Sequence, residues 1–117
     1  MDDRKSSNKK SEMELFFEAV DLGIKEWDEF FKDHDFNGYL YEDDIDFIYG
    51  VMDKFYTRVR TIRRSLPKEI KEVGMKGMPS LRQISNTPED SDSHLSDWEY
   101  TIRNRWVNVK KLQNKYI

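Results

Sequence analysis

The sequence predicts a small all-α domain, because apolar residues recur at steps of three and four in three long stretches. Two of these stretches begin with a Ser-x-x-Glu pattern that caps helices, and the 117 residues include only 5 Gly and 3 Pro. We expect three helices, or four if residues 67–73, with proline in the first turn, form a short one. They would make one domain over residues 11–117, preceded by a disordered tail over residues 1–10.

The first helix is expected over about residues 11–32. Ser11 and Glu14 form its capping box, and apolar residues from position 13 to position 31 then make one continuous helical face. Leu15, Leu22 and Phe30 fall outside this face. The helix is therefore apolar on more than one side, so it is either central in the fold or partly covered by a partner.

The second helix is expected over about residues 41–65, where Ile45 and Ile62 bound an apolar stripe. Acidic residues fill its first turns and arginines its last, and both choices complement the helix dipole. The dipeptide Leu66-Pro67 ends it, because the residue before proline avoids the α region.

The third helix is expected over about residues 97–115, with Ser96 and Glu99 as a second capping box. The segment 74–94 before it is predicted to be irregular, since it contains two Gly and two Pro and has no sustained period. Four apolar residues in it would either clip it onto the core or dock another chain: Met75, Met78, Leu81 and Ile84.

The helical faces together predict the core. It is expected to contain Phe16, Phe17, Val20, Ile24, Trp27, Phe31, Ile45, Ile48, Tyr49, Met52, Phe55, Tyr56, Trp98, Ile102, Trp106 and Val109.

Composition excludes several classes of protein. Without Cys there is no disulfide scaffold, thiol nucleophile or thiolate metal site. No nucleophile-elbow, phosphate-loop, dinucleotide-binding or zinc-protease motif occurs, so we expect no enzyme. No apolar run approaches the ~20 residues that span a bilayer. The first eleven residues lack the apolar core of a signal peptide, so no membrane and a cytoplasmic location are expected.

Charge is segmented along the chain, although the net charge is only −3. Residues 12–53 contain fourteen acidic and two basic residues, whereas residues 54–84 contain nine basic and two acidic ones. Either oppositely charged helices pack side by side, or a segment serves as a binding surface.

Three functions fit this pattern. The first is a non-enzymatic interaction or regulatory module that acts through protein–protein contacts, with a homodimer as one form. The second is nucleic-acid binding through basic residues at the ends of helices two and three, namely Arg58, Arg60, Arg63, Arg64, Lys68, Lys71, Lys110 and Lys111. The third is a small acidic phage or mobile-element inhibitor that mimics nucleic acid through Glu42, Asp43 and Asp46. The polar composition of the sequence, with Lys, Asn and Ile, would suit a protein encoded by an AT-rich bacterial or phage genome.

One loop suggests a metal site. Residues 33–44 read DHDFNGYLYEDD, in which acidic or amide residues alternate before Gly38. Calcium takes six to eight oxygen ligands, and alternating carboxylates on a tight turn can converge on one cation. With its flanks over residues 24–52, this loop resembles a single EF-hand of the parvalbumin-like type. The resemblance implies these ligands: Asp33, Asp35, Asn37, Tyr39 and Asp44.

The resemblance implies at most one bound Ca²⁺ or Mg²⁺, held weakly, because Asp44 stands where the family mostly has the longer Glu. The alternative is a helix–turn–helix corner without metal. Asn37-Gly38 is a common turn dipeptide, and acidic residues are ordinary in the first turn of a helix.

A cation titration distinguishes the two. If the loop binds metal, millimolar Ca²⁺ or Mg²⁺ will shift the amide NMR signals around Gly38, and Asp33→Ala will abolish the shift because it removes the first ligand. Unchanged spectra at millimolar metal would contradict the cation site.

Overall fold

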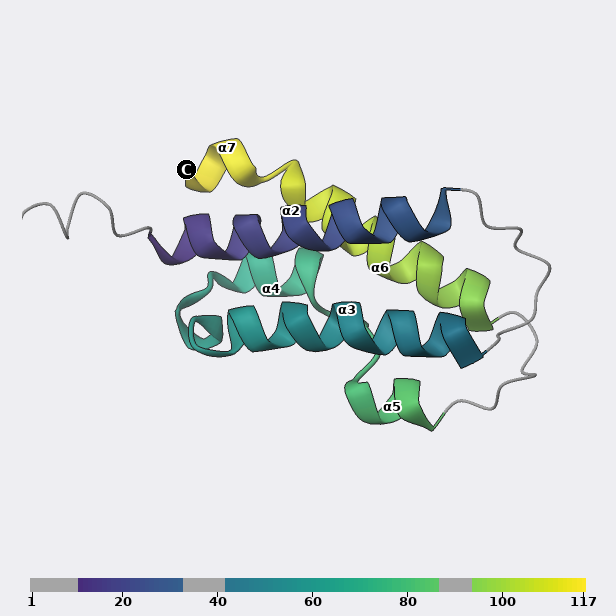
Figure 1. The fold of residues 1–117 in the computed structure, drawn as a ribbon. Coiled ribbons are helices and arrows are strands. Elements are labelled where there is room, and N and C mark those ends of the chain that lie inside the picture. Colours follow the sequence, from purple (N-terminus) through teal and green to yellow (C-terminus); the bar gives the residue numbers. More distant parts are fainter. Residues whose placement is uncertain (1–10, 33–41, 87–93) are drawn as a thin grey trace, which may run out of the picture.

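The computed structural model describes residues 11–32, 42–86 and 94–117, and every regular element in these ranges is helical (Figure 1). The elements are α2 (Glu12–Phe31), α3 (Glu42–Arg60), the 3-10 turn η1 (Arg63–Ser65), α4 (Lys68–Gly74), α5 (Leu81–Ser85), α6 (His94–Lys110) and α7 (Gln113–Tyr116). The predicted all-α class is confirmed. The predicted tail over residues 1–10 lies outside the described residues.

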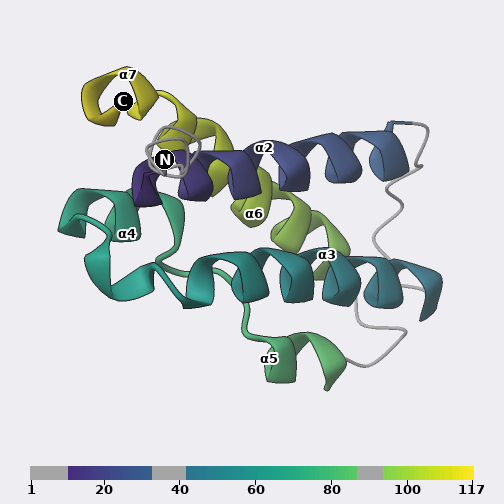
Figure 2. The same ribbon diagram turned by 60° about the vertical axis from the view of Figure 1, so that its left-hand side comes forward.

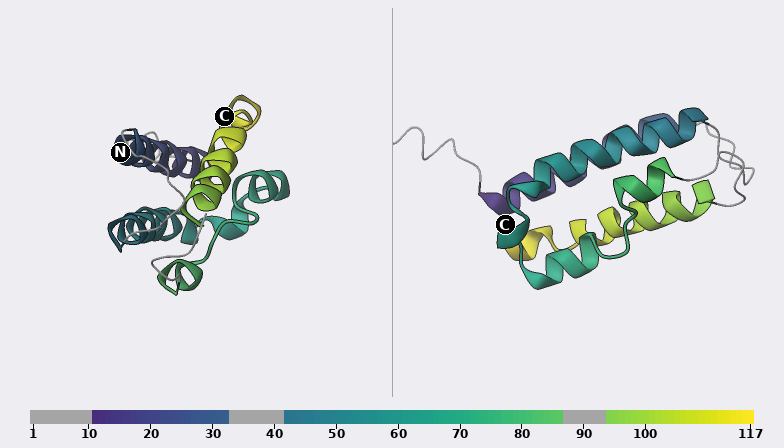
Figure 3. Two further views of the ribbon diagram at one scale, coloured as in Figure 1. Left: turned by 90° about the vertical axis from the view of Figure 1, so that its right-hand side faces the viewer. Right: turned by 90° about the horizontal axis from the view of Figure 1, so that it is seen from below.

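Helices α2 and α3 run antiparallel side by side, and α6 packs across both of them (Figures 1 and 2). The Trp106 ring of α6 lies 5.8 Å from Trp27 of α2 and 5.4 Å from Phe55 of α3, measured between ring centroids. Helix α4 packs against α6, and α5 packs against α3. In the end-on view, α6 and α4 lie on one side of the α2–α3 pair, and no described helix covers the other side (Figure 3).

The closest approach in this packing is at Gly23 of α2. A Cβ atom at this position would lie 2.6 Å from Cη2 of Trp106, a distance that real Cβ contacts do not show. The absence of a side chain at Gly23 therefore lets the fully buried Trp106 ring sit directly against the α2 backbone. Gly74 of α4 admits Val109 of α6 in the same way, at 2.8 Å from the Val109 Cγ2.

The start of α2 is predicted correctly. The Ser11 hydroxyl accepts a hydrogen bond from the Glu14 amide at 3.1 Å, and the Ser11 amide donates to the Glu14 carboxylate at 2.8 Å. The second predicted capping box is wrong, because α6 begins at His94 and already includes Ser96. The Glu99 carboxylate instead accepts from Arg103 Nε at 2.6 Å and from the Trp27 indole at 3.4 Å.

The predicted second helix is too long. Helix α3 ends at Arg60, and the chain then turns through η1 into the extended residue Leu66 before Pro67. Ile62 and Leu66 are both buried in this turn. The third predicted helix is likewise broken by a turn at Lys111 and Leu112 that separates α6 from α7.

The predicted irregular segment contains regular structure. Helix α4 reaches Gly74, and α5 forms behind an overlooked capping box in which the Ser80 hydroxyl accepts from the Gln83 amide at 3.1 Å. Ile84 is fully buried and Met75 is 8% exposed, so this segment is clipped onto the core, which is one of the two interpretations expected. Residues 87–93 lie outside the described part.

Most of the predicted core is confirmed. Eleven of its residues are buried: Phe16, Phe17, Val20, Trp27, Phe31, Ile48, Met52, Phe55, Ile102, Trp106 and Val109. Four are partly buried and pack against these: Ile24, Ile45, Tyr56 and Trp98. Tyr49 is wrong, since it is 39% exposed. It lies two residues before Val51, which is buried, so it points to nearly the opposite side of α3.

Ion pairs join the helices across the predicted charge segments. Lys110 of α6 pairs with Asp21 of α2 at 2.7 Å, and Arg103 of α6 pairs with Asp28 of α2 at 2.6 Å. Lys54 of α3 pairs with Glu26 of α2 at 2.9 Å. Part of the charge segmentation therefore reflects oppositely charged helices that pack side by side.

A further contact fastens the C-terminal end. Lys115 and Tyr116 both donate to Glu69 of α4, at 2.8 and 2.7 Å. These two hydrogen bonds lower the pKa of Glu69 below its ordinary value. Among the described residues, no helix is both long enough and apolar enough to cross a membrane.

The glycine contacts give a matched pair of stability predictions. Gly23→Ala will lower the free energy of unfolding by about 1–3 kcal/mol, because the added methyl group displaces Trp106. Gly50→Ala in α3 will raise it by about 0.5–1 kcal/mol, since alanine favours the helix and its Cβ meets no atom within 4 Å. Urea unfolding measures both, and equal effects of the two substitutions would contradict the packing described.

Candidate functional site

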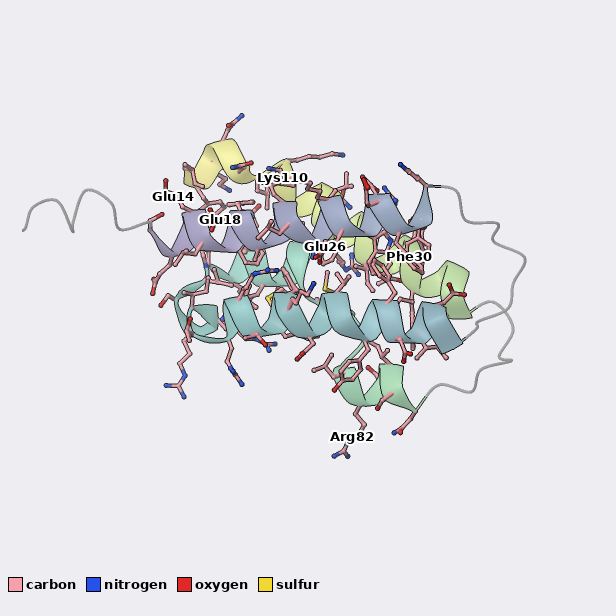
Figure 4. All side chains as sticks on the ribbon, in the orientation of Figure 1. Glu14, Glu18, Glu26, Phe30, Arg82 and Lys110 are labelled. Carbon is pink, nitrogen blue, oxygen red and sulfur yellow. The ribbon has the colours of Figure 1, made fainter. Side chains whose placement is uncertain are left out.

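A groove of about 390 Å³ lies between α2 and α3, in the half of the pair nearest to the end of α2 and the start of α3. We call it the α2–α3 groove. Its apolar and small lining residues are Phe30, Phe47, Gly50 and Val51, and its charged lining residues are Glu26, Glu29, Asp46 and Lys54. Glu26 and Phe30 lie between the two helices in Figure 4.

Stacked aromatic rings form one end of the groove. The Phe30 and Phe47 rings are parallel within 7° and their centroids are 3.9 Å apart. Phe47 also contacts Phe31 at 5.5 Å and Trp27 at 5.8 Å, so this end is continuous with the buried core. Both Phe30 and Phe47 remain partly exposed, and they present apolar surface that the fold itself leaves uncovered.

The charge of the groove is predominantly negative. Three carboxylates line it, from Glu26, Glu29 and Asp46, against the single ammonium group of Lys54. Lys54 is already paired with Glu26. Glu29 and Asp46 are both exposed and form no ion pair with any described residue, so the negative charge that faces an occupant comes from them.

Gly50 differs from the other glycines that the structure describes. Gly23 and Gly74 admit Trp106 and Val109, and Gly77 has a φ of 84°, which side chains rarely adopt. A Cβ atom at Gly50 would meet no atom within 4 Å. Gly50 lies well inside α3, where glycine destabilises a helix by about 0.5–1 kcal/mol relative to alanine. Neither packing nor backbone geometry within the described chain requires it.

Exposed leucines extend the apolar surface along α2. Leu22 is 39% exposed and Leu15 is 38% exposed. Leu22 is four residues before Glu26 and seven before Glu29, and Leu15 is seven before Leu22, so all four share one side of the helix. These leucines, predicted to lie off the main apolar face, continue the line of the groove toward the start of α2.

Most of the predicted metal ligands fall outside the described residues: Asp33, Asp35, Asn37 and Tyr39. Asp44 lies in the first turn of α3 and is only 3% exposed. Within residues 11–32, 42–86 and 94–117, no three His, Asp or Glu side chains gather as metal ligands do. The cation site in the loop stays a prediction.

Six of the eight predicted basic residues lie on three consecutive elements of the structure. Arg58 and Arg60 lie in the last turn of α3, Arg63 and Arg64 in η1, and Lys68 and Lys71 in α4. Lys110 is engaged elsewhere, because it pairs with Asp21 and also donates to Gln113 at 2.6 Å (Figure 4). Lys111 is exposed in the turn after α6.

The predicted acidic surface is described only in part. Asp46 is exposed and lines the α2–α3 groove, whereas the side chains of Glu42 and Asp43 lie outside the described part. The groove itself was not predicted from the sequence, although Phe30 falls outside the main apolar face of α2. Phe47 and Gly50 also lie off the predicted apolar stripe of α3. Apolar or small residues outside the main faces of both helices were the sequence signal for a groove.

A second pocket, also of about 390 Å³, lies beside the end of α3 and is lined by Tyr56, Arg63, Met75, Met78, Ser80 and Leu81. The Tyr56 hydroxyl donates to the Pro79 carbonyl at 2.7 Å and ties the chain before α5 to α3. Burial raises the pKa of Tyr56 to about 12, although the nearby Arg63 guanidinium opposes the shift. Tyr56 is therefore a neutral hydrogen-bond donor at physiological pH.

Comparison with protein-family models, with curated proteins and with solved structures finds no match to this chain. The geometry of the grooves and charges is therefore the basis for any functional conclusion.

The raised pKa of Tyr56 has a consequence for stability. The Tyr56 phenol has its ordinary pKa of 10.0 in the unfolded chain and a pKa of about 12 in the folded protein. Its preference for the neutral form therefore adds to the free energy of unfolding in full below about pH 10, and this gain is lost as pH rises toward about 12. An absorbance titration of the phenolates will show a step near pH 12 that Tyr56→Phe removes. Tyr49→Phe, at an exposed position, will leave that step in place. A step that survives in Tyr56→Phe would contradict the assignment.

Proposed function

We propose that this chain is a non-enzymatic protein-interaction module whose α2–α3 groove takes an apolar segment of a partner protein that also carries basic residues. The observation that supports the proposal most directly is Gly50, a glycine inside a helix and open to the groove. Three features argue for it: the space kept at Gly50, the charge around it and the apolar surface that continues from it.

The space at Gly50 allows a close approach to the α3 backbone. Glycine in the interior of a helix lowers stability, and the described chain gains no internal contact from it here. A side chain of a partner that reaches this position can pack directly on the backbone of α3, between Phe47 and Val51. The loss of helix stability would then be offset only in the complex.

The charge of the groove selects the partner's chemistry. Glu29 and Asp46 are exposed acids beside an apolar surface, and Lys54 is held by Glu26. A partner segment with Lys or Arg beside its apolar side chains complements this arrangement, whereas an acidic segment is repelled. Such complementarity acts mainly on specificity and on the rate of association.

The shape fits a helix better than an extended strand. The groove runs along the seam of two antiparallel helices, and Leu22 and Leu15 continue its apolar line by two turns each. An amphipathic helix that lies in such a groove uses apolar anchors three, four and seven residues apart. A regulatory role, control by a cation in the 33–44 loop, a homodimer and a cytoplasmic location stay predictions.

Selection from a random peptide library tests this function and requires no named partner. Enriched peptides will combine aromatic or aliphatic anchors with Lys or Arg, and will bind at least about tenfold more weakly to Gly50→Leu, because its side chain fills the groove.

The matched control is Tyr100→Ala on α6, at a side chain that is 66% exposed and away from the groove. It will leave the affinity of the enriched peptides unchanged. Peptides that bind Gly50→Leu as tightly as the wild-type protein would refute the groove as the binding site. Gly50→Ala adds an independent readout, since it will weaken binding while it stabilises the free protein.

A further inference from the structure

A second stretch of the chain, separate from the residues that line the α2–α3 groove, is strongly basic. We define the basic corner as Arg58, Arg60, Arg63, Arg64, Lys68 and Lys71, which follow one another through the end of α3, η1 and α4. Lys71 is half-buried and the other five side chains are exposed. The only acid between positions 58 and 71 is Glu69, and its carboxylate accepts from Lys115 and Tyr116.

The cations of the basic corner differ from four cations elsewhere in the described part of the fold. Lys54, Arg103, Lys110 and Lys115 each form an ion pair. None of the six in the corner forms an ion pair within the described ranges. The Glu12 carboxylate, which accepts from the Ser65 hydroxyl of η1 at 3.2 Å, brings one acid to this corner and offsets only part of the positive charge.

The helix dipole explains only part of the basic corner. Arg58 and Arg60 lie in the last turn of α3, where cations stabilise a helix. Arg63 and Arg64 lie beyond that helix, and Lys68 lies at the start of α4, where a cation is unfavourable. These last three positions need a reason other than helix stability.

The apolar side chains of the basic corner are buried in the core, and its exposed side chains are charged or polar. The apolar residues of the same stretch, Val59, Ile62, Leu66 and Ile70, are all at most 5% exposed. No exposed large apolar residue lies between positions 57 and 71. A basic surface that binds membranes by insertion needs apolar side chains beside its cations, and this surface has none to offer.

We propose that the basic corner binds the phosphate backbone of nucleic acid. Four of its six cations are arginines, whose planar guanidinium groups donate paired hydrogen bonds to phosphate oxygens. Exposed cations on three consecutive elements suit a polymer that carries one charge per nucleotide. The first turns of α3 carry acids at the opposite end of the same helix, so nucleic acid approaches this molecule at the basic end only.

Salt-dependent binding tests the proposal. Fluorescence anisotropy with labelled duplex and single-stranded oligonucleotides of about 20 nucleotides, between about 50 and 200 mM KCl, will show an affinity that falls steeply with salt. The triple variant Arg60→Gln, Arg63→Gln, Arg64→Gln will bind at least about tenfold more weakly at the lowest salt. Its slope of log affinity against log salt on duplex will be shallower by about 0.9 for each phosphate that the variant leaves without a cation.

A control variant carries the same change of charge at exposed cations elsewhere, Lys25→Gln, Lys32→Gln and Arg82→Gln (Figure 4 labels Arg82 on α5). It will keep its affinity within about twofold of the wild-type protein. An equal loss in both variants would overturn the corner as the site. So would no binding at low salt, or tighter binding to vesicles with anionic lipids or to polyglutamate than to either oligonucleotide. These outcomes are independent of peptide binding in the α2–α3 groove.

Discussion

The fold depends on one contact, the Trp106 ring of α6 against the backbone of α2 at Gly23. Because a Cβ there would lie 2.6 Å from the ring, the contact fixes how closely α6 can cross α2. The same ring touches Trp27 and Phe55, so it determines which sides of α2 and α3 are buried. The opposite side of the pair is left without a described helix over it, and the residues that line the α2–α3 groove come from α2 and α3 alone.

Local signals that act within one helix could be predicted from the sequence, and contacts between helices could not. The capping box at Ser11 and most core positions follow from spacing of three and four, and both are confirmed. The predicted start at Ser96 was wrong, since α6 begins at His94 and Glu99 pairs with Arg103 one turn later in the same helix. Glu99 also accepts from Trp27 of α2, a partner that only tertiary packing supplies. The groove could not be predicted for a related reason. The sequence shows a glycine at position 50, but only the structure shows that a Cβ atom there would meet no atom within 4 Å.

The charge segments separate into two physical kinds. In the first, acids of α2 meet cations of α3 and α6 across helix interfaces, as Asp21 and Lys110 do. Such exposed pairs contribute little to stability, typically below about 1 kcal/mol each, but they favour one arrangement of the helices. In the second, the basic corner gathers six cations without ion pairs among the described residues. The net charge of −3 does not show this difference, because it counts a charge in an ion pair and a charge without one equally.

The aromatic contacts also give the molecule a built-in optical reporter. Phe47 lines the α2–α3 groove and touches the fully enclosed indole of Trp27, which in turn meets Trp106 at an edge-to-face angle of 86°. Indole emission responds to small changes in the packing and polarity around the ring. An occupant that displaces Phe47 therefore changes the intrinsic fluorescence of the core, and no dye has to be attached to the surface that binds.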